Sequence, residues 1–563
     1  MIQAFSETVE AKVHTPVYTM HKYFARRPWN VFNQLISHYS LPGDIVLDPF
    51  AGGGVTVVES LKLRRKVVGV DVNPLATYIA SMEARPLDLS SFEETVLHLK
   101  SKLKNEIRSL YVTRCEKCNE LAIADWIEWD QKRQRPIRLK YDCEKCDDTS
   151  QKAVSKADRE LAEKIDYDFS RLIQQRKLWY PETSIPAGDK THSLIKQGFH
   201  FFHELFTKRN LIALAILFDA INQLQETDEK DFLKFAFSSS LKWTSRLSHL
   251  RGTIVEGWAM HAYWVYPKSL EMNVWNTFER RTKALIRGKQ YSSEYIGDYC
   301  RFAHAFSDIA SGAATCLLLN RSSAQLPLPA DSVDIIITDP PYGGNVNYGE
   351  LSDFWWVWLN GGETAEKRHE AIINRTQGKS LNEYEEILVN VFSECHRVLK
   401  PERCLVSTFN SKDMRVVASF VKATSIAGFS LHPEGLLYQK PIRPYVTTFH
   451  AMQIGAFVGD FIFTFLKTEA PTSVMEIELP DLKRRLDELM TEKSKDEAAE
   501  TKLRIRVYRA LIPFLAHHAK SDPTACQGAV DYFEAKIRGR NDYFSQLRKH
   551  VIDGRRKKFQ RGP

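Results

Sequence analysis

The chain has 563 residues, of which 43% are hydrophobic and 26% are charged. That length exceeds one ordinary hydrophobic core, so we expect a globular protein of two to four domains. The chain has no apolar run long enough to cross a bilayer and no signal-peptide pattern, which excludes a membrane-spanning protein and favours a cytoplasmic one.

The net charge of +8 is modest, but basic residues are clustered. One cluster comprises Lys132, Arg133, Arg135 and Arg138. Such a cluster suits contacts to phosphate groups, although a basic run can also be a solvated surface. We therefore treat these four residues as candidate nucleic-acid contacts.

The first recognisable pattern is a helix followed by a strand. Pro28 suits the first turn of a helix, and the apolar residues from Val31 to Tyr39 then fall on one helical face. A Pro-Gly-Asp turn follows, and residues 45–48 read as a strand.

The strand leads into a glycine-rich turn at residues 48–54, Asp-Pro-Phe-Ala-Gly-Gly-Gly. Glycines between a strand and a helix let the backbone approach a ligand beside the positive end of the helix. A second strand ends at Asp71, where a carboxylate can accept hydrogen bonds from ribose hydroxyls, and Asn73 can cap the next helix. A dehydrogenase is the alternative, but the turn lacks Gly-x-Gly-x-x-Gly.

From about Ala84 to Cys316 this α/β pattern is interrupted. The interruption contains two Cys-x-x-Cys pairs, formed by Cys115, Cys118, Cys143 and Cys146. Four thiolates form a closed tetrahedral set that suits one structural Zn²⁺. A redox-active Cys-x-x-Cys is the rival, but neither pair lies in a thioredoxin-like context.

Aromatic residues then alternate with basic ones, including Arg246 and Arg251. Such a segment can stack on bases and bind phosphates. A core of buried aromatic rings is an equally good interpretation of each ring.

Another buried parallel strand ends at Asp339 and is followed by Pro340, Pro341 and Tyr342. The two prolines make a stiff loop that presents a carboxylate, free carbonyls and an aromatic ring at the carboxyl end of the strand. The alternative is a proline-rich turn after a core strand. The next segment, which contains Tyr348, is expected to form a loop and helix over a substrate pocket, and residues 405–409 and 460–466 read as further strands.

Several of these segments resemble S-adenosylmethionine-dependent methyltransferases that modify exocyclic amino groups of nucleic-acid bases. Residues 339–342 resemble their catalytic Asp-Pro-Pro-Tyr motif, residues 48–54 their Asp-Pro-Phe-x-Gly-x-Gly cofactor motif, and residues 70–74 their acidic motif. Residues 21–23 resemble the upstream segment that flanks the methionine end of the cofactor. The whole chain resembles prokaryotic adenine-specific DNA methylases with a zinc-ribbon insertion.

The resemblance implies a doubly wound, Rossmann-like α/β sheet that is split by an insertion. We expect residues 1–85 and 316–470 to form the methyltransferase domain, 86–315 the insertion with a zinc ribbon at about 111–150, and 471–563 a charged helical appendage. Target recognition is expected mainly in the insertion. S-adenosylmethionine is expected to contact His21, Lys22, Tyr23, Asp48, Pro49, Phe50, Gly52, Gly54, Asp71, Val72, Asn73 and Ser322.

The implied reaction is methyl transfer to the exocyclic amine of a flipped base, with adenine N6 favoured over cytosine N4. Asp339 and the Pro340 carbonyl would accept the two N–H bonds of the amine, while Tyr342 stacks on the base and Tyr348 contacts the nucleic acid. The expected partner is double-stranded DNA in a prokaryotic nucleoid, together with other subunits of a restriction-modification or defence system. An RNA base methyltransferase is the nearest alternative. A DNA-binding zinc protein with a degenerate enzyme domain is opposed by the intact Asp339, Tyr342, Gly52 and Asp71.

Overall fold

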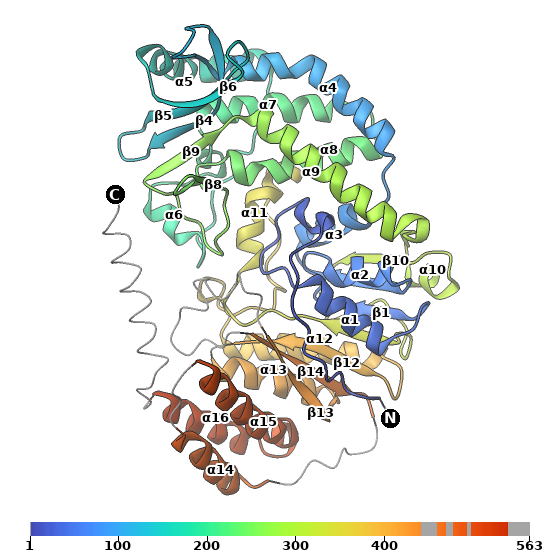
Figure 1. The fold of residues 1–563 in the computed structure, drawn as a ribbon. Coiled ribbons are helices and arrows are strands. Elements are labelled where there is room, and N and C mark those ends of the chain that lie inside the picture. The colour runs from blue at the N-terminus through green and yellow to red at the C-terminus, as the bar shows by residue number, and fades with distance from the viewer. Residues whose placement is uncertain (1, 412, 441–458, 469–476, 493–496, 539–563) are drawn as a thin grey trace.

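The computed structural model describes residues 2–411, 413–440, 459–468, 477–492 and 497–538. Within these ranges, none of the helices combines the length and apolarity that a membrane span requires. The molecule has a central sheet, a large helical and β insertion on one side of it, and a group of helices on the other (Figure 1).

The central sheet has seven strands in the order β10-β2-β1-β11-β12-β14-β13. The first five are parallel and β14 is antiparallel to both of its neighbours. Their bounds are β1 Ile45–Asp48, β2 Lys66–Asp71, β10 Cys316–Asn320, β11 Ile335–Thr338, β12 Cys404–Phe409, β13 Ser430–Gln439 and β14 Asp460–Leu466. The chain order reverses between β1 and β11, where open α/β sheets bind ligands at the carboxyl ends of their strands.

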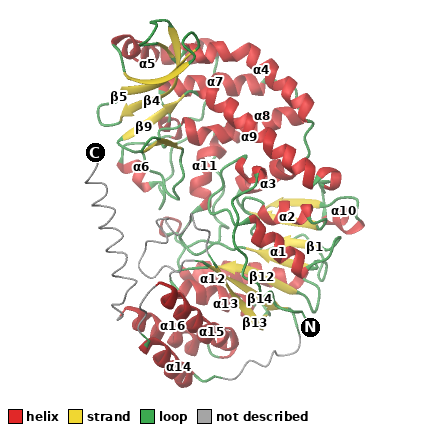
Figure 2. Ribbon diagram, in the orientation of Figure 1, coloured by secondary structure: helices red, strands yellow, loops and turns green. Residues whose placement is uncertain are grey.

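Helices cover both faces of this sheet (Figure 2). Val46 and Val67 belong to the hydrophobic core on the side of α1–α3, and their neighbours Leu47 and Val68 belong to the core on the side of α12 and α13. This alternation follows from the period of two in a strand, and it explains why the short strands are apolar throughout. The helices are α1 Trp29–Tyr39, α2 Val55–Lys62, α3 Pro74–Ala84, α12 Leu381–Val398 and α13 Met414–Ile426.

The insertion between β2 and β10 is mostly helical (Figure 1). Capping residues mark the starts of its helices: the Asp88 side chain accepts hydrogen bonds at the start of α4, and Ser155 with Asp158 forms a capping box at α5. Its helices are α4 Leu89–Ser109, α5 Lys156–Arg176, α6 His192–Lys196, α7 Lys208–Asn222, α8 Asp228–Thr244, α9 Val274–Tyr295 and α10 Phe306–Ser311. The 3₁₀ turns of the described chain are Pro16–Thr19, Phe202–Leu205, Gly297–Tyr299 and Arg375–Gln377.

A five-stranded antiparallel sheet lies at the far end of the insertion. Its strands are β3 Val112–Arg114, β4 Leu121–Asp130, β5 Arg135–Cys143, β6 Asp148–Ala153 and β9 Lys268–Met272. Strand β9 is distant in sequence and pairs with β4, from Trp126 opposite Met272 to Asp130 opposite Lys268. A separate hairpin consists of β7 His249–Arg251 and β8 Ile254–Glu256.

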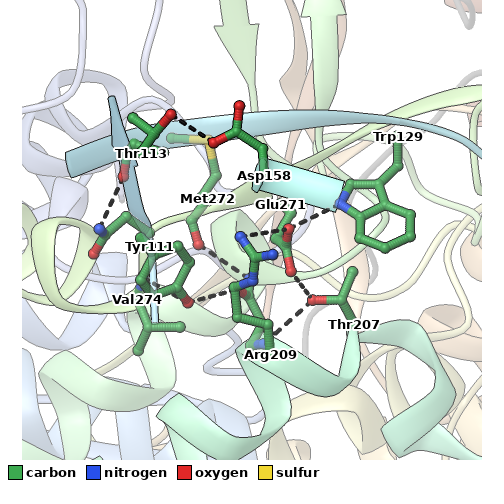
Figure 3. Close-up of polar contacts among 12 residues, drawn as sticks. Tyr111, Thr113, Trp129, Asp158, Thr207, Arg209, Glu271, Met272 and Val274 are labelled. Carbon is green, nitrogen blue, oxygen red and sulfur yellow. Dashed lines mark hydrogen bonds and ion pairs between the residues drawn. The ribbon is translucent and has the colours of Figure 1, made fainter. Parts of the chain in front are cut away.

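A buried polar network joins this small sheet to the helices (Figure 3). The carboxylate of Glu271 on β9 accepts hydrogen bonds from Thr207 and from the indole of Trp129, and the Arg209 guanidinium lies 3.7 Å away. Because a buried carboxylate is stable only when it is paired, this network fixes the sheet against the start of α7.

Helix α11, Tyr348–Leu359, follows the β11 loop and packs against both the insertion and the sheet domain. Its rings Phe354, Trp355 and Trp358 are fully buried among aromatic side chains of the insertion. The last helices, α14 Leu479–Thr491, α15 Glu497–Ser521 and α16 Pro523–Arg538, pack beside α13.

Candidate active site

A pocket opens at the carboxyl ends of β1, β2 and β11, and its empty space, part of it open to solvent, is about 840 Å³. The glycine-rich turn, the acidic end of β2 and the loop after β11 all line this pocket, although they are far apart in the sequence. The predicted residues among its walls are Tyr23, Asp48, Pro49, Phe50, Gly52, Asp71, Val72, Asn73, Ser322, Asp339, Pro341 and Tyr348.

The glycine-rich turn needs its glycines for two reasons. Gly52 and Gly54 have φ of 49° and 78°, in the left-handed region that favours glycine. A Cβ at Gly54 would also lie 2.8 Å from the Cβ of Ala80, so the turn could not pack on α3. The turn therefore leads directly into α2 and leaves room for a ligand above it.

Asp71 ties the acidic end of β2 to this turn. Its Oδ2 accepts a hydrogen bond from the Gly52 amide at 2.8 Å, and its Oδ1 accepts one from the Asn73 amide at 2.8 Å. The Asn73 side chain caps α3, as predicted, and also donates to the Ser352 hydroxyl at 2.7 Å. Burial raises the pKa of Asp71 to about 6, so the carboxylate lies in a place where a hydrogen-bond donor from a ligand would stabilise its charge.

Asp48 has a different role, because its carboxylate points along the sheet edge. It accepts hydrogen bonds from the Phe50 amide at 3.0 Å and from the Thr338 hydroxyl at 2.6 Å. Burial raises its pKa to about 6. These bonds join the ends of β1 and β11, so Asp48 fixes the two halves of the site to each other.

The carboxylate of Asp339 has three hydrogen-bond donors. Arg27 Nε donates to Oδ2 at 2.5 Å, while the hydroxyls of Tyr342 and Thr408 each donate to Oδ1 at 2.5 Å. The same guanidinium donates to Asp460 on β14 at 2.9 Å. Burial raises the pKa of Asp339, and the Arg27 charge opposes that rise.

The ring of Tyr342 is covered by its neighbours in this structure. The Arg27 guanidinium lies 4.7 Å from the ring centroid, and the ring of Phe409 lies 4.7 Å away. Tyr384 donates to the Pro341 carbonyl at 2.7 Å and fixes the proline loop. The ring predicted to stack on a base is therefore held beside Asp339 and covered by its neighbours, and Tyr342 is not among the residues that line the pocket.

Other predicted residues lie around this centre or outside it. The rings of Tyr23 and Tyr348 stack on each other with their centroids 5.7 Å apart, and both residues line the pocket. His21 packs against the insertion, with its Nε2 3.1 Å from the Ser238 hydroxyl, and neither His21 nor Lys22 is among the residues that line the pocket. Pro340 and Gly54 also lie behind the lining residues.

Sequence reasoning missed three charged residues of the pocket, namely Arg26, Arg27 and Glu370. The two arginines lie within four residues of the predicted segment 21–23. This closeness in sequence is the signal that could have identified them as pocket residues. Glu370 lies in a loop between α11 and α12, and no motif indicates it.

The four predicted zinc ligands meet at one point of the small sheet. Their sulfur atoms all lie within 4.8 Å of one another, with Cys115–Cys146 at 3.9 Å and Cys118–Cys143 at 3.6 Å. A tetrahedral zinc site with Zn–S bonds of about 2.3 Å has S–S separations of roughly 3.8 Å, so the cluster fits this metal. Each knuckle ends in a residue with positive φ, Asn119 and Asp147.

The predicted nucleic-acid contacts lie at the β4–β5 hairpin and near β7. Lys132, Arg133 and Arg135 are exposed, whereas Arg138 pairs with Glu128 at 3.1 Å. Arg246 donates to the Gln131 side chain and to the Phe206 carbonyl, and Arg251 pairs with Glu256 at 3.0 Å. At the tip of the hairpin Arg133 pairs with Asp130 at 3.3 Å, and all three exposed basic residues remain accessible to solvent.

Most of the aromatic segment forms core. Trp258, Tyr263 and Trp275 are buried, and Trp258 stacks on both Tyr263 and Trp355. Trp264 is an exception, since 42% of it is exposed.

Comparison with known proteins identifies relatives of this architecture. A family model described as DNA methylase (N6/N4) matches residues 4–82 and 333–484, and it leaves out the insertion. The type II methyltransferase M.MjaII of Methanocaldococcus jannaschii is 20% identical over 409 residues, which is 69% of each chain. The type II methyltransferase M.MvaI of Kocuria varians is 21% identical over 318 residues, covering 56% of this chain and 50% of the relative.

The crystal structure of a candidate DNA modification methylase from Thermus thermophilus is 14% identical and covers 38% of this chain and 91% of its own, with a TM-score of 0.16. So low a score supports no statement about this chain. The family match and the two curated relatives agree with each other. Residues 4–82 and 333–484 match the DNA methylase (N6/N4) family model, and the two curated relatives also support a DNA amino-methyltransferase.

Proposed function

We propose that the protein transfers a methyl group from S-adenosylmethionine to the exocyclic amine of a base flipped out of DNA, as part of restriction-modification or another defence system. The observation that carries the proposal is the single pocket that contains both Asp71, at the end of β2, and Asp339, at the end of β11. The preference for adenine N6 over cytosine N4 rests on the resemblance of the Asp-first tetrapeptide.

The cofactor fits the groups along one side of this pocket. Asp71 would accept hydrogen bonds from the ribose hydroxyls, and Phe50 and Gly52 line the same pocket. Ser323 lines it as well, and its hydroxyl donates to the Pro49 carbonyl at 2.7 Å. When bound, S-adenosylmethionine supplies an electrophilic methyl group.

Asp339 would act on the target amine. An aromatic amine is a poor nucleophile because its lone pair is delocalised into the ring. A carboxylate offers about four acceptor positions, and three are used here, so one remains for an N–H of the amine. Accepting that bond, together with the Pro340 carbonyl, localises the lone pair and stabilises the positive charge that develops on the nitrogen.

The described arrangement is closed to the base. For Tyr342 to stack on a flipped base, the Arg27 guanidinium must leave its face. The bond to Asp460 gives Arg27 a second partner that does not depend on this face. Base flipping costs roughly a few kcal/mol, and stacking on Tyr342 would offset part of that cost.

Arg27 should set the pH range in which Asp339 is ionised. Replacing Arg27 by Gln removes the charge that lowers the Asp339 pKa and leaves burial to raise it. Because the active form is the carboxylate, the acid limb of kcat/KM should then move to higher pH. The other groups near Asp339 are Tyr342, Thr408, Tyr348, Asp48 and Asp460.

The measurement is a pH–rate profile of wild type, Arg27→Gln and Arg27→Lys. The Arg27→Lys variant keeps the positive charge, so the acid limb of its kcat/KM profile should lie close to that of wild type. If Arg27→Gln lowers activity equally at every pH, the residue has only a structural role.

Double-stranded DNA is the proposed substrate, and RNA is the competing one. The test is a methyl-transfer assay on duplex DNA, single-stranded DNA and RNA of matched sequence. We expect transfer to duplex DNA to dominate. A preference for RNA would contradict the proposal.

We further propose that the insertion reads the DNA, with the β4–β5 hairpin contacting phosphates. Replacing Arg133, Arg135 and Arg138 by Ala should weaken DNA binding and reduce its salt dependence by roughly one unit of slope per lost phosphate contact. Binding of the cofactor should not change. The matched control is Arg484→Ala with Arg485→Ala on α14, also exposed, which should leave DNA binding unaltered. A triple variant that binds DNA like wild type would place the contact elsewhere.

A further inference from the structure

Glu370 is a buried carboxylate that forms no ion pair within the part of the chain that the structure describes. Only 4% of the residue is exposed. Its Oε1 accepts a hydrogen bond from the Gly349 amide at 3.0 Å, but its Oε2 is buried and has no hydrogen-bond partner among the described residues. The nearby Lys379 ammonium donates to the backbone carbonyls of Lys367 and Glu370 rather than to the Glu370 carboxylate.

Arg26 contributes a buried positive charge to the same pocket, where Glu370 contributes a negative one. Its Nη1 donates to the Gly53 carbonyl at 2.7 Å and to Glu83 at 2.8 Å, while its Nη2 is buried and, within the described ranges, has no hydrogen-bond partner. The guanidinium lies so close to the glycine-rich turn that a Cβ at Gly53 would be 3.1 Å from its central carbon. Both Arg26 and Glu370 line the pocket.

Unpaired polar atoms of buried charged groups are costly, and native structures retain few of them. One free donor of a guanidinium and one free acceptor of a carboxylate complement a zwitterion. An α-amino acid group has this composition, with a carboxylate that accepts and an ammonium that donates three hydrogen bonds. We infer that Arg26 binds the α-carboxylate and Glu370 the α-ammonium of the amino-acid end of the cofactor.

The surroundings of Glu370 support a cationic partner. Burial raises its pKa to about 7, Lys379 lowers it, and the carboxylates of Asp71 and Glu350 raise it again. A ligand ammonium would therefore relieve repulsion that the protein itself does not neutralise. Asp71 is suited to the ribose hydroxyls and Asp339 to the target amine. Glu370, another carboxylate of the pocket, therefore remains for the ammonium group of the cofactor.

This inference rests on the proposed function and alters one part of the sequence prediction. His21 and Lys22 were expected at the methionine end of the cofactor, yet they do not line the pocket. Arg26, a few residues further along the same segment, does.

Two ligands separate the amino-acid end from the nucleoside end. S-adenosylhomocysteine and 5′-methylthioadenosine are both neutral thioethers of adenosine, and only the first carries an amino acid group. Calorimetric affinities should be measured for both with wild type, Glu370→Gln, Asp71→Asn and Glu366→Gln. Glu366 is exposed on the same loop and provides the matched control.

Glu370→Gln should weaken S-adenosylhomocysteine about ten- to a hundred-fold, as expected for a hydrogen bond to a charged group, and leave 5′-methylthioadenosine unchanged. Asp71→Asn should weaken both ligands, and Glu366→Gln neither. Arg26→Lys should also act on S-adenosylhomocysteine alone. A general loss of protein stability would weaken the binding of both ligands, so it cannot produce a loss that is confined to S-adenosylhomocysteine.

Equal effects of Glu370→Gln on both ligands, or none on either, would overturn the inference while the cofactor pocket itself stands. Wild-type protein that binds neither ligand would overturn this inference and the proposed function together.

Discussion

Replacing Asp339 by Asn should lower methyl transfer by about 10²–10⁴-fold, the range typical of losing a group that acts in the transition state. The amide keeps the shape of the side chain but loses the negative charge that favours the developing positive charge on the amine. It also presents an N–H₂ toward a group that itself donates hydrogen bonds. Binding of S-adenosylmethionine and DNA should persist, because the interaction strengthens only as the amine reacts.

The matched control is Asp460→Asn. Asp460 makes the other ion pair of Arg27 and undergoes the same chemical change, but it lies on β14 rather than in the proline loop. Its effect on turnover should be much smaller. Turnover of Asp339→Asn close to that of wild type would refute the catalytic role of Asp339.

Replacing Cys143 by Ser should release one Zn²⁺ and unfold the small sheet. We propose a structural zinc, because four cysteine ligands leave no open coordination position. Structural zinc sites have apparent binding free energies of about 10–16 kcal/mol, which is more than the stability of most domains. Metal analysis of the native protein should find about one equivalent.

Cys526→Ser is the control for this substitution. Cys526 is also a buried free cysteine, but it lies on α16, away from the cluster. The variant should retain the metal and the stability of the insertion. Native protein without zinc, or a Cys143→Ser protein that keeps it, would contradict the proposal.

The sheet that carries the site could be predicted well from the sequence. The strands ending at Asp48, Asp71 and Asp339 are short, apolar and bounded by glycine or proline, so each was found close to its observed limits. Asn73 caps α3 as predicted because Asn followed by Pro is a strong local signal.

Strands β13 and β9 could not be predicted in the same way. Strand β13 contains Pro433 and Gly435, and its register shifts between Leu431 and Leu436, which hides the alternation of an edge strand. Strand β9 pairs with β4 across an insertion of helices, and nothing local indicates that partner. Pairing between distant segments is set by tertiary packing rather than by local pattern.

In the candidate site, too, some residues could be predicted from local sequence motifs and others could not. Motif residues such as Gly52, Asp71 and Asp339 were predicted and do line one pocket. Two other charged residues of the site belong to other segments: Arg27, which pairs with Asp339, and Glu370, which lines the same pocket. They follow from three-dimensional contacts, which a single sequence does not contain.

The most direct test of the central claim is the identity of the methylated product. Purified protein should be incubated with S-adenosylmethionine and unmethylated duplex DNA, and the DNA should then be digested to nucleosides for mass spectrometry. We expect N6-methyladenine in DNA treated with the wild type and none in DNA treated with the Asp339→Asn variant. N4-methylcytosine would overturn the choice of adenine. C5-methylcytosine, or no methylated nucleoside, would contradict the assignment of this chain as an amino-methyltransferase.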